Sequence, residues 1–222
     1  MNASKTLATF VIFGTLITAT SGQTVGREES TLANDVLERR VVGDEAEYLT
    51  TKHAFSSSLW LTRAPGGMVE ISGCYDDSLQ QRWRPLGLSL REVLDEIVAA
   101  DPRCRWEKRD GVINLVPVAR EPALLNVRIK VFDVENASTA ETALGQLLKL
   151  PAVQEGMNRL HLRAGLNIII GPIPRPTQFS VHCKDATLRQ VLNAIALAHG
   201  RAVWDYVETH CNGHDEVIVR FR

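Results

Sequence analysis

The chain of 222 residues lacks an excess of charge of either sign. Its 25 Lys and Arg residues nearly balance its 26 Asp and Glu residues, which gives a formal net charge of -1 at neutral pH. The basic residues form no dense run or stripe, although such a stripe is the usual electrostatic signature of a nucleic-acid-binding protein. We therefore expect no nucleic-acid partner.

Familiar catalytic motifs are also missing. The sequence holds no Gly-x-Ser-x-Gly nucleophile motif and no glycine-rich phosphate loop. The pair Gly66-Gly67 directly follows Pro65, and this combination predicts a hairpin turn. We expect a protein that is not an enzyme and has no cofactor. An enzyme of unrecognised type, with a site assembled from residues far apart in the sequence, is one alternative.

The apolar segment near the N-terminus is too short for a membrane span, which needs about 20 residues. It runs from Leu7 to Ile17 after Lys5, and small residues follow from Ala19 to Gly22. This order predicts a cleavable signal peptide over residues 1–22, and an uncleaved anchor or a disordered start is the alternative. We expect a periplasmic or secreted protein with no stable membrane span after cleavage.

One pattern occurs twice in the chain. Leu90-Arg91-x-Val93-Leu94-x-x-Ile97 leads to Trp106, and Leu188-Arg189-x-Val191-Leu192-x-x-Ile195 leads to Trp204. Every matched position is offset by 98 residues, as Leu90 and Leu188 are. Ser89 with Glu92, and Thr187 with Gln190, predict a capping box at the start of each helix. The spacing predicts a duplicated strand-helix-hairpin unit.

The repeated tryptophans and arginines have simple structural interpretations. We expect Trp106 and Trp204 each to pack from a strand onto the preceding helix, and a ligand-stacking platform is the alternative. Arg91 and Arg189 are predicted to be surface charges at the helix starts. Asp110-Gly111 predicts a tight turn in the first hairpin, whereas a longer loop over 208–216 is predicted in the second.

Apolar periodicity and turn residues predict the remaining elements. The two repeated units comprise a strand over 68–75, a helix over 90–98 and strands over 104–107 and 112–118, then a strand over 179–183, a helix over 188–199 and strands over 202–207 and 217–221. Elsewhere we expect helices over 27–40, 45–55, 140–150 and 151–162, strands over 59–62, 125–134 and 166–170, an irregular insert over 76–87 and a stiff connector over 171–176.

These elements predict an α+β fold of two small modules, in which helices pack on short mixed sheets. The expected divisions are a signal peptide over 1–22, a first module over 27–118, a linker over 119–124 and a second module over 125–222.

Four cysteines become candidates for disulfides if the chain is exported, because an oxidising compartment permits them. Pairing within each unit, Cys74 with Cys104 and Cys183 with Cys211, is the economical choice among three connectivities. Four free buried thiols are the alternative.

Histidines beside two of these cysteines raise the possibility of a metal site. His182 precedes Cys183, and the order His210-Cys211-x-x-His214 places further ligand types in the second hairpin. Tetrahedral zinc favours such ligands. The spacing matches no standard zinc motif, and Asn212-Gly213 is typical of a turn. We therefore expect no metal site and keep His182, His210, Cys211 and His214 as the alternative.

The segment from Met68 to Pro117 resembles the second half of the secretin and TonB short N-terminal domain. The resemblance rests on Ile71-Ser72-Gly73-Cys74-Tyr75, then the helix from Leu90 to Ile97, then Trp106 and the strand Val112 to Val116. The segment Phe179 to Phe221 resembles the same unit without the Ser-Gly element. The resemblance implies a periplasmic module that docks onto other proteins, although this sequence shows no barrel or secretin region.

The sequence therefore predicts an exported, non-enzymatic protein-interaction module of the cell envelope. Its partner would be an envelope or periplasmic protein whose identity the sequence does not specify. A metal-binding protein that uses the C-terminal His and Cys residues is the alternative from another class.

Overall fold

The computed structural model describes residues 36–42, 48–74, 80–83, 86–165 and 178–222. The predicted signal peptide, the strand over 166–170 and the connector over 171–176 lie outside these residues, as does most of the predicted helix over 27–40. The fold is α+β with short mixed sheets, as the sequence predicts.

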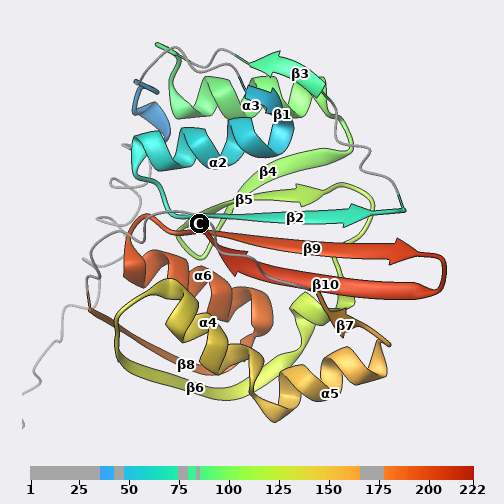
Figure 1. The fold of residues 1–222 in the computed structure, drawn as a ribbon. Coiled ribbons are helices and arrows are strands. Elements are labelled where there is room, and N and C mark those ends of the chain that lie inside the picture. The colour runs from blue at the N-terminus through green and yellow to red at the C-terminus, as the bar shows by residue number, and fades with distance from the viewer. Residues whose placement is uncertain (1–35, 43–47, 75–79, 84–85, 166–177) are drawn as a thin grey trace, which may run out of the picture.

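The elements follow one another along the chain in the order shown in Figure 1. The first half contains β1 (Tyr48–Thr50), α2 (Thr51–Thr62), β2 (Gly66–Ser72), β3 (Gln80–Trp83), α3 (Leu90–Ala100), β4 (Cys104–Arg109) and β5 (Val112–Pro117). The second half contains the 3-10 helix η1 (Ala123–Asn126), β6 (Arg128–Ala137), α4 (Ala140–Leu148), α5 (Pro151–Arg159), β7 (Arg163–Ala164), β8 (Phe179–Thr187), α6 (Leu188–His199), β9 (Val203–Cys211) and β10 (His214–Phe221).

A six-stranded sheet in the order β4-β5-β2-β9-β10-β7 crosses the middle of the molecule. β2 runs parallel to β9 from Gly66 beside Val203 to Ser72 beside Thr209. The two hairpins, β4–β5 and β9–β10, are antiparallel. Both halves of the chain therefore share one sheet, and the division into two modules at 119–124 stays a prediction.

Apolar side chains alternate along this sheet and form a core on each face. Met68 and Val203 belong to the core that α2 and α3 cover, whereas Val69 and Trp204 belong to the core beneath α4, α5 and α6. Figure 1 shows these two helical layers on opposite sides of the sheet. The antiparallel pair β6–β8 forms a separate two-stranded sheet that completes the second layer.

Both predicted capping boxes are confirmed. The Ser89 hydroxyl accepts from the Glu92 backbone N–H and the Glu92 carboxylate accepts from the Ser89 N–H, and Thr187 and Gln190 repeat this exchange. Each box satisfies backbone donors that the first helical turn leaves unpaired. The helices of the two repeated segments therefore begin where the sequence predicts.

Each repeated tryptophan packs toward its preceding helix through the same kind of hydrogen bond. Trp106 donates from Nε1 to Asp95 Oδ1 of α3 at 2.8 Å, and Trp204 donates to Asn193 Oδ1 of α6 at 2.9 Å. The predicted packing on the helix is thus confirmed at both positions. Trp204 is fully buried and Trp106 is half-buried.

The second hairpin differs from its prediction. Its strands continue to Cys211 and His214, so no long loop spans 208–216. Asn212 and Gly213 form the turn with φ of 51° and 75°, as Asp110 and Gly111 do in the first hairpin with φ of 53° and 76°. Two consecutive left-handed residues are typical of a tight hairpin turn, so strand pairing extends up to it.

Several other local predictions are wrong. Residues 59–62 belong to α2, where the Thr62 hydroxyl donates to the Ser58 carbonyl within the helix. The predicted helix over 45–55 is partly replaced by β1, because Thr50 caps α2 and the helix begins only at Thr51. The insert over 76–87 contains β3, which pairs with β1.

Arg189 is also not a surface charge. Its side chain is buried and its guanidinium donates to Glu107 Oε1 of β4 at 2.7 Å and to Glu121 Oε1 at 2.8 Å. Arg91 at the equivalent position is more exposed and pairs with Glu38 at 3.1 Å. The two arginines occupy equivalent positions of the repeated pattern, yet Arg91 lies at the surface of α3, whereas Arg189 of α6 connects the two halves of the chain.

The Gly66-Gly67 pair begins β2 and does not form the predicted turn. A Cβ atom on Gly67 would lie 2.0 Å from Cε2 of Trp204, its neighbour across the parallel pair. Gly67 is therefore needed to leave room for the buried indole of Trp204, and it serves this purpose within a strand and not within a turn.

We predict that Gly67→Ala destabilises the protein by about 1–3 kcal/mol, because the added methyl group forces the indole out of its packed position. The measurement is the free energy of unfolding in urea. Gly145→Ala is the control, since nothing lies within 4 Å of its Cβ position in α4. That change should stabilise the helix by up to about 1 kcal/mol. Equal effects of the two substitutions would contradict the packing argument.

Candidate docking site

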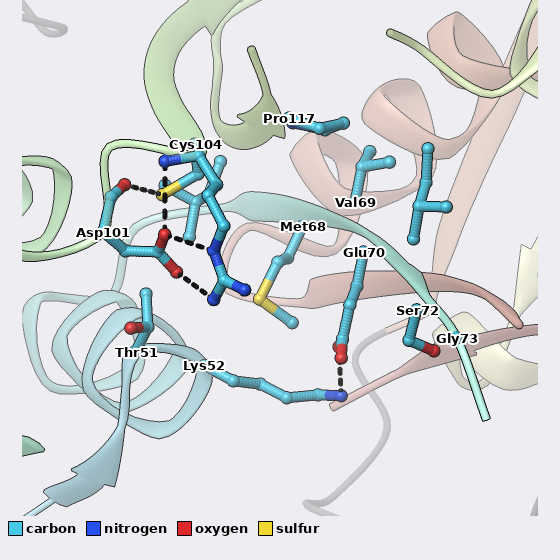
Figure 2. Close-up of a pocket in the computed structure, with 13 residues that line it drawn as sticks. Thr51, Lys52, Met68, Val69, Glu70, Ser72, Gly73, Asp101, Cys104 and Pro117 are labelled. Carbon is cyan, nitrogen blue, oxygen red and sulfur yellow. Dashed lines mark hydrogen bonds and ion pairs between the residues drawn. The ribbon is translucent and has the colours of Figure 1, made fainter. Parts of the chain in front are cut away.

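A pocket of about 190 Å³ opens on the α2 side of the sheet, where β2 runs past the end of β5. Figure 2 shows α2 residues on one wall, β2 residues on another and the turn between α3 and β4 on a third. Its lining residues are Thr51, Lys52, Met68, Val69, Glu70, Ile71, Ser72, Gly73, Asp101, Arg103, Cys104, Leu115 and Pro117.

The β2 wall is an open strand edge. β2 pairs with β5 only from Gly66 to Met68, whereas its pairing with β9 continues to Ser72. β5 ends at Pro117, and Val118 then donates its backbone N–H to the Arg103 carbonyl at 2.8 Å. Continuing this register places Val116 and Pro117 beside Val69 and Glu70, so that, among the described strands, β2 extends beyond β5 only at Ile71 and Ser72.

Two ion pairs line the pocket, and each is satisfied within the protein. Lys52 Nζ lies 2.7 Å from Glu70 Oε2. Arg103 donates from Nε and Nη2 to the two carboxylate oxygens of Asp101 at 2.8 and 3.0 Å, and these hydrogen bonds lower the pKa of Asp101 below its usual value. The pocket therefore has a charged rim in which positive and negative groups already neutralise each other.

Two further side chains determine the chemistry of the pocket. Burial raises the pKa of the Cys104 thiol to about 11, and its Sγ donates to the Asp101 carbonyl at 3.1 Å. This thiol stays protonated near neutral pH, so it is a weak nucleophile there. The Thr51 Oγ1 is buried without a hydrogen-bond partner in the structure. The residues that line the pocket are therefore better suited to binding another molecule through van der Waals contact and hydrogen bonds than to nucleophilic attack on it.

Apart from Ser72 and the disulfide candidate Cys104, the polar residues of this pocket were not singled out from the sequence. Thr51, Lys52 and Glu70 are ordinary polar residues whose positions depend on how α2 lies against β2. One signal did point here, because Ile71-Ser72-Gly73 carries part of the resemblance described above and lies along the β2 wall. Tyr75 of the same motif lies outside the described residues.

A disulfide joins Cys74 to Cys211 just beyond the paired ends of β2 and β9. The predicted pairing of Cys74 with Cys104 and of Cys183 with Cys211 is therefore wrong. β5 lies between β2, which leads to Cys74, and β4, which begins at Cys104. Two strand spacings together amount to about 10 Å, which exceeds the Cα separation of about 7 Å that a disulfide tolerates. The Cα atoms of Cys74 and Cys211 lie 4.5 Å apart.

Cys104 and Cys183 are free thiols. Cys183 lies on β8, in the separate two-stranded sheet. Burial raises the pKa of its thiol, and the nearby Asp133 carboxylate adds to this effect. The cysteines thus divide into one bridge between neighbouring strands and two half-buried thiols.

The alternative metal ligands do not come together in the structure. His182 lies on β8 beside Asp133, whereas His210 and His214 lie at the tip of the β9–β10 hairpin and Cys211 is oxidised. Within the part of the chain that the structure describes, no group of three His, Cys, Asp or Glu side chains could hold a metal ion.

His210 instead joins a chain of hydrogen bonds along the hairpin. The buried Tyr206 hydroxyl donates to Glu208, and His210 lies between Glu208 Oε1 at 2.9 Å and Asp215 Oδ1 at 3.1 Å. Partial burial lowers the pKa of His210, but Asp215 and Glu208 outweigh it and the net effect raises the pKa. Both ring nitrogens face carboxylates, so the arrangement favours the protonated imidazole.

Comparisons with known proteins give no relative on which to base a function. No protein-family model matches the chain, and neither the curated proteins nor the solved structures include a significant match. The resemblance to the secretin and TonB short N-terminal domain therefore stays a prediction.

We predict that the oxidised protein, unfolded in denaturant, contains two titratable thiols and yields a disulfide-linked peptide pair from Cys74 and Cys211. Breaking the bridge with Cys74→Ala and Cys211→Ala together should cost about 4–5 kcal/mol in the chain-entropy model, because it closes a loop of 137 residues. Thiol titration and peptide mapping test the pairing, and urea denaturation tests the energy. Four free thiols in exported protein would contradict the bridge.

We predict that His210 stabilises the fold in a pH-dependent way. Its folded pKa lies above the ordinary value of 6.5, so the folded state binds this proton more tightly than the unfolded state does. The stabilisation is complete below pH 6.5 and is lost as the pH rises through the folded pKa.

The difference in unfolding free energy between the native protein and His210→Gln should therefore be larger at pH 5.5 than at pH 9. His214→Gln is the control, because no ion pair holds His214 in the described part of the chain. An NMR titration midpoint for His210 at or below 6.5 would contradict the assignment.

Proposed function

We propose that this protein is an exported, non-enzymatic interaction module that docks onto a protein of the cell envelope. The observation that carries the proposal is the end of β2 at Ile71 and Ser72, which extends past Pro117 at the end of β5 and lines a pocket. Strand edges with unpaired peptide groups are common places for another chain to bind.

The disulfide supports an extracytoplasmic location, because such bridges form and persist in oxidising compartments. Cys74 and Cys211 are joined in the structure, and residues 1–22 have the pattern of a secretory signal. Among the described helices, none has the length and apolar character that crossing a bilayer requires.

An internal duplication is part of the same proposal. The segments around α3 and α6 share capping boxes, tight hairpin turns and a hydrogen bond from a tryptophan to the preceding helix. These shared features are consistent with two copies of one strand-helix-hairpin unit. The resemblance to the secretin and TonB short N-terminal domain suggests docking as the class of activity and suggests no particular partner.

Site-specific photo-crosslinking tests this function. We predict that a photoreactive phenylalanine analogue at Ile71, which is 40% exposed beside the pocket, forms a crosslink to an envelope protein in the native cell. The matched control is the same analogue at Val131, an exposed strand residue on β6 with no place in the pocket.

The expected result is a discrete adduct from position 71 that is absent from position 131. Both variants are first shown to unfold at the same urea concentration as the native protein. Identical adducts from the two positions, or no adduct from position 71, would reject docking at this site.

A further inference from the structure

We infer that a second pocket, at the same end of β2 and β9, binds a free α-amino acid with an aliphatic side chain of about the size of leucine. Of the residues that line it, only Ile71 also lines the docking pocket. This binding site therefore goes beyond the proposed docking function and does not depend on it.

The second pocket lies at the open end of the core beneath α4, α5 and α6. Glu208 is the neighbour of Ile71 in the pairing of β2 with β9. Both side chains point to the face of the sheet that carries Trp204, because side chains alternate along a strand. The chain leading into η1 and the chain following α5 form the other walls. The lining residues are Ile71, Arg120, Pro122, Ala123, Leu160, Leu162, Glu208 and His210.

Two opposite charges line this pocket without pairing with each other. Glu208 is buried at 9% exposure, whereas Arg120 is exposed. Within the described residues, the Arg120 guanidinium forms no ion pair. The charged groups of the docking pocket, by contrast, already neutralise each other. A guest with one cationic and one anionic group can satisfy both Glu208 and Arg120.

The buried carboxylate can accept further hydrogen bonds. The Tyr206 hydroxyl donates to Glu208, and His210 Nε2 lies 2.9 Å from Glu208 Oε1. A carboxylate offers about four acceptor positions, so room remains for an ammonium group. The other ring nitrogen of His210 lies 3.1 Å from Asp215 Oδ1 and is not available to a guest carboxylate. The ammonium group of the guest therefore belongs at Glu208.

Arg120 is the natural partner of the guest's carboxylate. A guanidinium group presents its N–H donors in a planar fork that matches the two oxygens of a carboxylate. Since no other group of the described protein occupies this fork, an α-carboxylate can bind there without displacing an existing ion pair.

The remaining walls determine the side chain of the guest. Five of the eight lining residues are apolar, namely Ile71, Pro122, Ala123, Leu160 and Leu162. The volume of about 250 Å³ lies just below the roughly 300–1,000 Å³ of pockets for drug-sized ligands. The guest is therefore small, and an aliphatic side chain gains free energy by leaving water for these walls.

Guests with a single charge fit the pocket less well. An aliphatic carboxylate can pair with Arg120 but gives the Glu208 carboxylate no additional donor. An aliphatic amine can donate to Glu208 but leaves Arg120 unpaired. Only the zwitterion uses both groups and the apolar walls together.

The test titrates L-leucine into the full chain with its disulfide intact and follows the backbone amides of the lining residues by NMR. We expect a dissociation constant of about 1 mM or lower. Glycine should bind at least tenfold more weakly, because it lacks the apolar side chain. The same loss is expected for 3-methylbutylamine, which lacks the carboxylate, and for 4-methylpentanoate, which lacks the ammonium group.

Combining protein variants with these ligands locates each charge. Arg120→Gln should weaken leucine at least tenfold and change the affinity for 3-methylbutylamine less than threefold. Glu208→Gln should weaken leucine at least tenfold and change the affinity for 4-methylpentanoate less than threefold. The matched control is Arg201→Gln, which removes an exposed arginine just after α6 and should leave leucine binding unchanged.

Urea denaturation checks that the variants fold. Arg120 is exposed, so its substitution keeps the test decisive if the buried Glu208 cannot be replaced. Absence of leucine binding, equal affinity for leucine and glycine, or an equal effect of Arg120→Gln on leucine and 3-methylbutylamine would overturn the inference. A crosslinked partner at Ile71 would still support docking in each of these cases, so the two proposals fail separately.

Discussion

The parallel pairing of β2 with β9 is the constraint on which the rest of the structure depends. It brings two hairpins that are distant in the chain into one sheet and gives that sheet two apolar faces. Gly67 permits the pairing beside Trp204, and the bridge from Cys74 to Cys211 closes its far end. The same pairing carries β2 beyond β5 and so exposes the edge that forms the candidate docking site.

Local signals predicted local structure well. The capping boxes, the end of α6 at His199 and the Asp110-Gly111 turn each depend on a few adjacent residues, and all three lie where the sequence places them. Hydrophobic periodicity identified α3 and α6 for the same reason, because their apolar stripes follow the helical repeat.

Features that depend on neighbours distant in sequence were not predictable in this way. Gly66-Gly67 follows a proline and has the composition of a turn, yet Leu59 and Trp204 require glycines there inside a strand. Arg91 and Arg189 occupy the same place in the shared Leu-Arg-x-Val-Leu pattern, but only Arg189 forms ion pairs with Glu107 and Glu121. The disulfide pairing and the pocket both require the order of strands, which no short motif encodes.

The two tryptophan hydrogen bonds differ in one chemical respect, since the acceptor is a carboxylate at Asp95 and an amide at Asn193. Trp106 and Asp95 remain accessible to water, so an ionised acceptor stays hydrated there. Trp204 and Asn193 are completely enclosed, and an ion at position 193 would lose its hydration. An exchange between acid and amide should therefore be tolerated at position 95 and should destabilise the protein at position 193.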